Sequence, residues 1–185
     1  CVCLGSGGGY VPRLMVDCIY ELNETQMYPE DTFGEVYVVD ATNGFNGEVD
    51  WSDEDSFLRE KFNPRFINST TTDAFYNFFV KRDVKIDYLH IDADHTYEGC
   101  KLDFDLYSTI MNENGIISIH DTDRKYWENF ETYDGEEHDS CTGPSEVVKE
   151  VSNKWEVFNL FDYREKNEVL PSSGLTLLRR KNEEV

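Results

Sequence analysis

Acidic and histidine side chains end two apolar segments of this chain. The first segment is Ile86–Asp94, with the sequence IDYLHIDAD, and the second is Ile116–Asp123, with the sequence IISIHDTD. Each is typical of a strand whose carboxyl end carries polar groups, and ligands of an open parallel sheet bind at such ends, where the strand order reverses. The ends are about 30 residues apart, the spacing of one βαβ unit. We therefore expect Asp92 and Asp121 to lie side by side.

Two neighbouring carboxylates without a lysine or arginine beside them repel one another unless a cation or a proton separates them. Mg²⁺ meets that need and leaves positions for water and for a substrate hydroxyl, whose pKa it would lower. We predict a metal site formed by Asp92, Asp121 and His120. Asp92 would thereby be catalytic, and His95, three residues later, would be the catalytic base. The alternative is that Asp94 or Thr96 only caps a helix and that the histidines are ordinary loop residues.

A glycine-rich turn, GSGGG, separates the first apolar run from a helical pattern. Glycines let the backbone approach a ligand closely, and a helix N-terminus offers unpaired N–H groups. The position of the turn between a strand and a helix favours a nucleotide-type ligand, although a simple tight turn is the alternative. We expect these residues to bind the cofactor: Gly5, Ser6, Gly7 and Gly9.

Three further strand ends supply candidate cofactor contacts. Asp40 ends the second predicted strand, where nucleotide-binding α/β folds often place an acid that accepts hydrogen bonds from both ribose hydroxyls. Ser69 and Thr70 follow the third predicted strand and would lie near the base, and Asp92 is also expected to contact the cofactor. A loop aspartate and ordinary polar strand ends are the alternatives.

The elements that must position these residues alternate along the chain. Strands are predicted at 1–4, 35–40, 65–68, 86–92, 116–120, 155–161 and 174–181, and helices at 10–24, 52–62, 72–80, 96–111 and 144–154. This order predicts a single α/β domain over residues 1–185, with a Rossmann-like, doubly wound, seven-stranded, mostly parallel sheet and an antiparallel edge hairpin. Apolar residues at helical spacing define a face of the first helix (Tyr10, Leu14, Cys18, Leu22) and of the fourth (Tyr97, Cys100, Phe104, Tyr107, Met111).

Composition narrows the class of protein. The chain has 185 residues, of which 39% are hydrophobic and 14% aromatic, as expected for a folded domain with its own core. A net charge of −21 repels phosphate backbones, so we expect no nucleic acid partner. No apolar run reaches the roughly 18 residues of a membrane span. Five cysteines without paired or zinc-type spacing indicate reduced thiols in a cytoplasmic protein. Because residue 1 is Cys, we expect the numbered chain to lack its native N-terminus.

The order of the motifs resembles that of class I S-adenosylmethionine-dependent methyltransferases. The motifs are GxGxG, an acid after the second strand, a hydrophobic-Asp-x-x-His sequence and HDT. More narrowly, LHIDADHTYEG and GIISIHDT look like the metal-dependent small-molecule O-methyltransferases, which include catechol, caffeoyl-CoA and macrolide-sugar enzymes. The resemblance implies S-adenosylmethionine as cofactor, with the glycines on its methionine part and Asp40 on its ribose. It also implies Mg²⁺-assisted methylation of a hydroxyl on a sugar or phenol-like acceptor.

Two departures from the family pattern accompany this resemblance. Cys3 stands where the family often has an acid, and His120 and Thr122 flank the second aspartate where an acid or amide is common. Three other functions stay open: a DxD-type nucleotide-sugar glycosyltransferase, an NAD-binding oxidoreductase, and a non-catalytic cofactor-binding domain. Segment 122–143 is either an acidic connection or a lid whose aromatic side chains pack on the acceptor. A homodimer is also left open.

Overall fold

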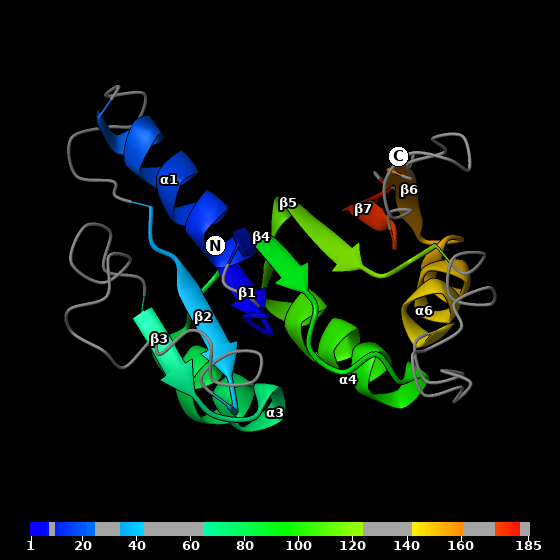
Figure 1. The fold of residues 1–185 in the computed structure, drawn as a ribbon, viewed down its shortest axis with the longest axis horizontal. Helices are drawn as coiled ribbons and strands as arrows, with labels where there is room; N and C mark the ends of the chain where they lie inside the picture. The colour runs from blue at the N-terminus through cyan, green and yellow to red at the C-terminus, as the bar shows by residue number, and fades with distance from the viewer. Residues whose placement is uncertain (8–9, 25–33, 43–64, 124–141, 161–172, 182–185) are drawn as a thin grey trace, which may run out of the picture.

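The computed structural model describes residues 1–7, 10–24, 34–42, 65–123, 142–160 and 173–181. Seven strands form one sheet in the order β3-β2-β1-β4-β5-β7-β6 (Figure 1). Pairing is parallel from β3 to β5 and antiparallel between β5, β7 and β6. The strands are β1 Val2–Leu4, β2 Tyr37–Asp40, β3 Arg65–Asn68, β4 Ile86–Ile91, β5 Met111–His120, β6 Trp155–Leu160 and β7 Leu175–Arg180. The predicted α/β fold with an antiparallel edge hairpin is therefore confirmed.

Helices cover both faces of the sheet (Figure 1). They are α1 Tyr10–Glu24, α3 Thr71–Ala74, α4 Tyr97–Tyr107 and α6 Gly143–Val151. A π-helical segment, Phe75–Phe79, and a 3₁₀ turn, Val80–Arg82, extend α3, and a second 3₁₀ turn, Ser108–Ile110, extends α4. Because strand side chains alternate between faces, Cys3 joins the core cluster of α1, whereas its neighbours Val2 and Leu4 join the cluster that α3, α4 and α6 complete.

The buried face of α1 differs from the expected one. Tyr10 is 85% exposed and Leu14 is 62% exposed, whereas Met15 and Val16 are buried against the sheet. The helix carries apolar residues on more than one side, so helical spacing alone could not tell which side the sheet covers. The expectation that Tyr10, Leu14 and Cys18 define the packed face was wrong.

The boundary between α4 and β5 also differs from the expected one. The helical pattern was extended to Met111, with a strand from Ile116, but β5 already begins at Met111, which pairs with Ile86. A register shift between Ile86 and Tyr88 of β4 accompanies this early pairing. The expected stripe of α4 is confirmed for Cys100, Phe104 and Tyr107, which are buried, and Tyr97 is partly buried; Met111 is buried as well, but as part of β5.

Several expectations lie outside the described residues: Gly9, the helix at 52–62, the aromatic residues of segment 124–141 and Cys141. The cysteines that the structure describes, Cys1, Cys3, Cys18 and Cys100, are free thiols, as expected. Within the described part of the chain, no helix combines the length and the apolar character needed to cross a membrane.

Candidate active site

A hollow of about 1000 Å³ opens at the carboxyl ends of the five parallel strands. Each of these ends contributes to its wall, so segments far apart in the sequence meet there. The predicted site residues that line it are Gly5, Gly7, Asp40, Ser69, Thr70, Asp92, His95, His120 and Asp121. Ser6 is buried, and its hydroxyl donates a hydrogen bond to the Asp40 carboxylate. The structure thus brings together the predicted metal residues and those predicted cofactor residues that it describes.

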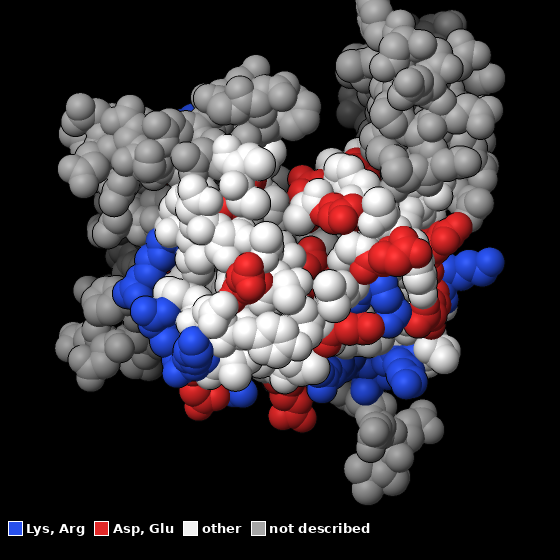
Figure 2. Space-filling model, turned by 90° about the horizontal axis from the view of Figure 1, so that it is seen from below, with Lys and Arg blue, Asp and Glu red and all other residues white. Residues whose placement is uncertain are grey.

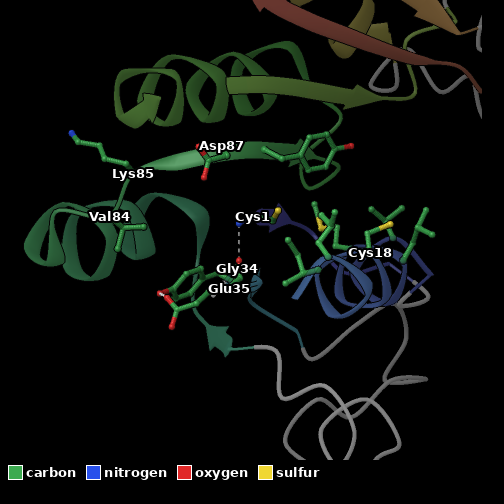
Figure 3. Close-up of a pocket in the computed structure, with 14 residues that line it drawn as sticks. Cys1, Cys18, Gly34, Glu35, Val84, Lys85 and Asp87 are labelled. Atoms are coloured by element: carbon green, nitrogen blue, oxygen red, sulfur yellow. Dashed lines mark hydrogen bonds between the residues drawn. The ribbon is translucent and has the colours of Figure 1, made fainter. Parts of the chain in front are cut away.

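A second hollow, of about 760 Å³, lies at the opposite end of the sheet beside α1 (Figure 3). Cys1 and Lys85 lie there, at the amino ends of strands, and the Cys1 ammonium donates a hydrogen bond of 2.7 Å to the Glu35 carbonyl oxygen. None of the residues that line this hollow was expected to bind cofactor or metal. Because ligands of parallel α/β sheets bind at the carboxyl ends, the first hollow is the candidate active site.

The turn after β1 lies directly against the end of β4. Gly5 has φ +82°, and a Cβ added there would lie 2.0 Å from the carbonyl oxygen of Asp92. Backbone hydrogen bonds of 2.9 Å from Gly5 N to Val39 O and from Asp92 N to Leu4 O hold the turn between its neighbours. Only glycine fits this combination of a positive φ and a close approach, so this glycine fixes the shape of the floor of the site.

The Asp40 carboxylate is held by four hydrogen bonds. Its Oδ2 accepts from the backbone N (2.8 Å) and the hydroxyl (2.6 Å) of Ser6. Its Oδ1 accepts from the backbone N (2.8 Å) and the hydroxyl (2.9 Å) of Thr42. Burial alone would raise the pKa of Asp40, but these bonds outweigh it and hold the pKa below its usual value. Asp40 therefore presents a fixed, ionised carboxylate to the hollow.

Four side chains form a ring of opposite charges at the ends of β4 and β5. His95 Nε2 lies 3.3 Å from Asp92 Oδ1 and 3.0 Å from Asp121 Oδ2. His120 Nδ1 lies 3.3 Å from Asp92 Oδ1 and 3.0 Å from Asp121 Oδ1. Asp92 and Asp121 are therefore brought together as expected, and the two histidines flank them.

The charges of this ring are strongly coupled. Contacts with Asp121 and Asp92 raise the pKa of His95 and of His120 from 6.5 to about 10, against the opposing effect of burial. Burial would raise the pKa values of the two carboxyls, but the contacts with His120 and His95 outweigh it and lower both. The side chains alone thus give a neutral set of two imidazolium and two carboxylate groups.

The backbone at the end of β5 explains how His120 and Asp121 reach the same site. Neighbouring residues of a regular strand point to opposite faces. Asp121 has φ +58°, an unusual value for a residue other than glycine. This conformation ends the alternation, so both side chains contact Asp92 or His95. Such local strain is typical of functional sites.

His90 is a buried residue of the site that the sequence analysis missed. Its side chain is 3% exposed, and its Nε2 lies 3.9 Å from Asp92 Oδ2. Its Nδ1 contacts the Ser118 hydroxyl at 2.8 Å, and Ser118 also contacts the Tyr88 hydroxyl at 2.8 Å. Burial lowers the pKa of His90 to about 4, so its ring is neutral. A histidine between the apolar residues Leu89 and Ile91 of a predicted strand was the available signal.

Both departures from the family pattern have a structural counterpart. Burial raises the pKa of the Cys3 thiol, which contacts the Gly5 carbonyl oxygen at 3.1 Å, so a neutral group stands where the family often has an acid. Thr122 is buried, and its hydroxyl accepts a 2.8 Å hydrogen bond from Thr176. Thr122 is therefore engaged away from the carboxylate pair, which leaves His120 as the neighbour of Asp121 at the ring.

The donor atoms of the ring fit a metal ion. Asp92, His95 and Asp121 each offer one atom within 4.8 Å of the others. Two buried nitrogens beside the carboxylates, His90 Nε2 and His120 Nδ1, have no aligned hydrogen-bond partner among the described residues. Carboxylate pairs and unpartnered nitrogens are groups that a divalent cation satisfies.

Comparisons with known proteins are consistent with this geometry. A family model described as a methyltransferase domain matches residues 2–122. Of the solved structures, an O-methyltransferase from Bacillus cereus in complex with SAH has a TM-score of 0.64 at 14% identity, over 97% of this chain and 73% of that one. An O-methyltransferase from Streptomyces achromogenes, involved in tomaymycin synthesis and solved with SAM, has a TM-score of 0.65 at 12% identity, over 98% and 72%.

An rRNA methylase from Streptococcus thermophilus has a TM-score of 0.59 at 10% identity, over 98% of this chain and 87% of that one. At these identities the likeness shows a shared fold. No curated protein matches the sequence of this chain.

Proposed function

This chain belongs to a family of methyltransferase domains, and we propose that it transfers the methyl group of S-adenosylmethionine to a hydroxyl oxygen of a small molecule. One observation supports the proposal most strongly: two groups of residues line the same hollow. The first group is the glycine turn and Asp40, and the second is the ring of Asp92, His95, His120 and Asp121. One half offers groups for a nucleoside, and the other offers groups that activate a hydroxyl. The family match leaves no observation in favour of the glycosyltransferase or the oxidoreductase.

The cofactor half would bind through groups that are already in place. The ribose hydroxyls would replace the hydroxyls of Ser6 and Thr42 on Asp40, whose oxygens accept two bonds each, while the two backbone N–H bonds stay. The open turn at Gly5 and Gly7 would accommodate the methionine part. Ser69 and Thr70, at the wall after β3, would lie near the base.

The catalytic half would be organised around Asp92 and Asp121, which would hold a divalent cation with His120 as a further ligand. When bound, the cation lowers the pKa of the acceptor hydroxyl. His95 Nε2 lies within 3.3 Å of both carboxylates. Because a bound cation would offset the charge of these carboxylates, they would raise the pKa of His95 less, and His95 would then take the proton of the acceptor hydroxyl. The S–CH₃ bond of the sulfonium breaks as the O–CH₃ bond forms, giving the demethylated cofactor, a methyl ether and one proton. Positioning of the two reactants supplies the rest of the rate.

The acceptor is proposed to be a hydroxyl of a sugar or a phenol. Both imidazoles of the ring are partly exposed at the hollow, so a hydroxyl can reach them. The solved O-methyltransferases support transfer to oxygen through the shared fold alone. A cofactor-binding domain without catalysis is the remaining alternative, and binding of the cofactor without turnover on any hydroxyl acceptor would favour it.

Calorimetry with S-adenosylmethionine and with its demethylated product tests the cofactor. We expect binding to the wild-type protein, and at least tenfold weaker binding, about 1.4 kcal/mol, by Asp40→Asn, because a charge-assisted acceptor of the ribose is lost. Asp83→Asn is the matched control, since Asp83 is exposed and lies before β4, at the other end of the sheet. An absence of binding by the wild-type protein would refute the proposed function.

A further inference from the structure

We infer that the cation site is a mixed nitrogen–oxygen site, in which His120 Nδ1 binds the ion with Asp92 and Asp121, and that it takes Co²⁺ or Zn²⁺ in preference to Mg²⁺. This inference rests on the proposed function, because it concerns the same site. It replaces the Mg²⁺ expected from the sequence with a cation of a different class.

The position of His120 Nδ1 suits a ligand atom. It lies 3.0 Å from Asp121 Oδ1 and 3.3 Å from Asp92 Oδ1. Ligand atoms bound about 2.1 Å from one ion and at right angles to each other are roughly 3 Å apart. Yet this buried nitrogen has no aligned hydrogen bond to a described residue. Two short distances to oxygen without an aligned hydrogen bond suit a nitrogen that shares an ion with these oxygens better than one that donates a proton to either.

His95 occupies a different place in the ring. Its Nε2 makes a hydrogen bond of 3.3 Å to Asp92 Oδ1 and lies 3.0 Å from Asp121 Oδ2, the other oxygen of that carboxylate. An aligned hydrogen bond is what a proton-carrying group makes, so the geometry favours His95 as the base and His120 as the ligand. Because His95 is also close enough to both carboxylates to ligate, the test must separate the two histidines.

The oxygen groups that could replace the nitrogen are engaged elsewhere. Thr122 accepts a hydrogen bond from Thr176 on β7. Asp94 Oδ1 accepts from the backbone N of Thr96 at 2.9 Å, at the start of α4. Both groups have hydrogen-bond partners outside the carboxylate pair, so among the described neighbours the nitrogen donors that contact both Asp92 and Asp121 are His95 and His120.

An independent observation supports an ion at Asp92. His90 is nine-tenths buried or more, and its unpartnered Nε2 lies 3.9 Å from Asp92 Oδ2, on the carboxylate oxygen that the ring does not use. Ser118 contacts its Nδ1 and so fixes the ring. Ligand carboxylates are commonly oriented by a second hydrogen-bonding layer. If its proton is on Nε2, His90 would orient the Asp92 carboxylate through Oδ2 and leave Asp92 Oδ1 to bind the ion.

The donor set decides the class of cation. Mg²⁺ prefers oxygen ligands and keeps several waters, whereas imidazole nitrogen suits zinc and the transition metals. A site with two carboxylates and one imidazole therefore gains affinity for the second class and little for Mg²⁺. These cations also lower the pKa of a bound hydroxyl, so the change of metal is compatible with the proposed reaction.

Calorimetric titration of chelator-treated protein with Co²⁺ and with Mg²⁺ tests the preference. Because Co²⁺ binds more tightly than Mg²⁺ at most sites, the decisive quantity is the ratio of the two affinities compared between variants. His120→Asn replaces the imidazole nitrogen with an amide oxygen. We expect it to lower the ratio of Co²⁺ affinity to Mg²⁺ affinity at least tenfold. His95→Gln, the matched control on the other side of the ring, should leave the ratio within a factor of about three.

Pulsed electron paramagnetic resonance of the Mn²⁺-loaded protein tests the ligand directly. Nitrogen coupling to the ion should be present in the wild type, should change on ¹⁵N-histidine labelling, and should be lost in His120→Asn but kept in His95→Gln. The labelled wild type needs no substitution, so the test survives a variant that fails to fold. Absence of histidine nitrogen coupling in the wild type overturns the inference, as does its loss in His95→Gln alone.

Cofactor binding on the same preparations keeps the two proposals apart. If the wild-type protein binds S-adenosylmethionine but shows no coupling of histidine nitrogen to Mn²⁺, only the metal assignment is overturned. Nitrogen coupling without any cofactor binding would overturn the proposed function and leave the metal site standing.

Discussion

At the scale of single residues, the site is a set of charges that neutralise each other. Asp92, Asp121, His95 and His120 surround one point, and each contact joins an acid to an imidazole. The pair of acids was predictable, because both follow apolar strands of one βαβ unit. His120 was also expected at the metal site, but the geometry by which its Nδ1 contacts both acids was not predictable, because it depends on the left-handed conformation of Asp121.

This coupling predicts a pH dependence for the stability of the metal-free protein. The pKa of His95 and of His120 is about 10 in the folded state and near 6.5 when unfolded. Raised pKa values of this kind stabilise the fold below pH 6.5, and the stabilisation is lost as the pH rises through 10. We expect the Tm, measured in the presence of a chelator, to fall between pH 6.5 and about 8.5. The range ends there because the cysteines of the unfolded chain ionise at higher pH. Each kcal/mol lost from the free energy of unfolding should lower the Tm by about 2–4 °C.

Thermal melts at intervals across this range measure the effect. The double variant His95→Gln/His120→Asn is the control, and its Tm should change much less over the same interval. An equal fall in the wild type and in the double variant would contradict the assigned pKa values.

A second residue-scale prediction concerns Asp103 on α4, which is 2% exposed. Burial raises its pKa to about 6, although a hydrogen bond from the Thr71 side chain lowers it. The ionised carboxyl is therefore a cost above pH 6, and the cost disappears as the pH falls from 6 to 3.8. We expect Asp103→Asn to stabilise the protein at pH 8 by up to about 3 kcal/mol.

Urea denaturation at pH 8 and at pH 4.5 checks this expectation. The difference between wild type and Asp103→Asn should shrink at the lower pH. The exposed neighbour Asp105→Asn is the control and should show no such pH-dependent gain. A destabilised Asp103→Asn at pH 8 would show that the charge is stabilised by a partner instead.

At the scale of elements, the turn after β1 couples the cofactor half to the catalytic half. A Cβ on Gly5 would meet the backbone of Asp92 at 2.0 Å, whereas a Cβ on Gly7 meets no described heavy atom within 4 Å. Both glycines have positive φ. We expect Gly5→Ala to cost about 3 kcal/mol or more, from backbone strain and overpacking, and Gly7→Ala about 1–2 kcal/mol.

Chemical denaturation of the two variants measures the difference, and Gly7→Ala serves as the control for strain without a clash. Cofactor titration of Gly5→Ala should also show weaker binding, because the end of β4 must move. Equal stabilities of the two variants would mean that the two strand ends are not in rigid contact.

At the scale of the whole molecule, charge is far from balanced. Acidic residues outnumber basic ones by 38 to 17. The face in Figure 2 nevertheless carries both signs, with basic side chains in groups toward its margins. The described part of this face is therefore not one uniform acidic surface, and the net charge of −21 counts as a repulsion summed over the whole chain.

Such repulsion predicts a stabilising effect of salt. Self-repulsion of a large net charge opposes the compact state, and raising the salt from about 0.05 to 0.5 M shortens the range of that repulsion to a few Å. We expect the Tm at pH 7.5 to rise with KCl. Near pH 4.4, the sequence pI, net repulsion vanishes, and melts there should show no rise. A Tm at pH 7.5 that is independent of salt would contradict this account.

Local sequence patterns were sufficient to predict the order of the described strands and helices, the α/β fold, and which strand ends carry the candidate site residues. These features depend on local periodicity and on residue type, which the chain displays without its partners. Asp40, Asp92 and Asp121 were placed at strand ends in this way, and all three line one hollow.

Tertiary packing was needed to establish which side of α1 is buried, where β5 begins, and that His90 lies beside Asp92. Met15 and not Leu14 faces the sheet, because the packing of α1 on Cys3 and Val38 selects one of several apolar sides. His120 and His90 reach Asp92 only because β4 and β5 are adjacent and because the backbone at Asp121 breaks the alternation of the strand. The contact of His90 with Asp92 and the backbone conformation of Asp121 depend on the neighbouring strands, so local periodicity did not predict them.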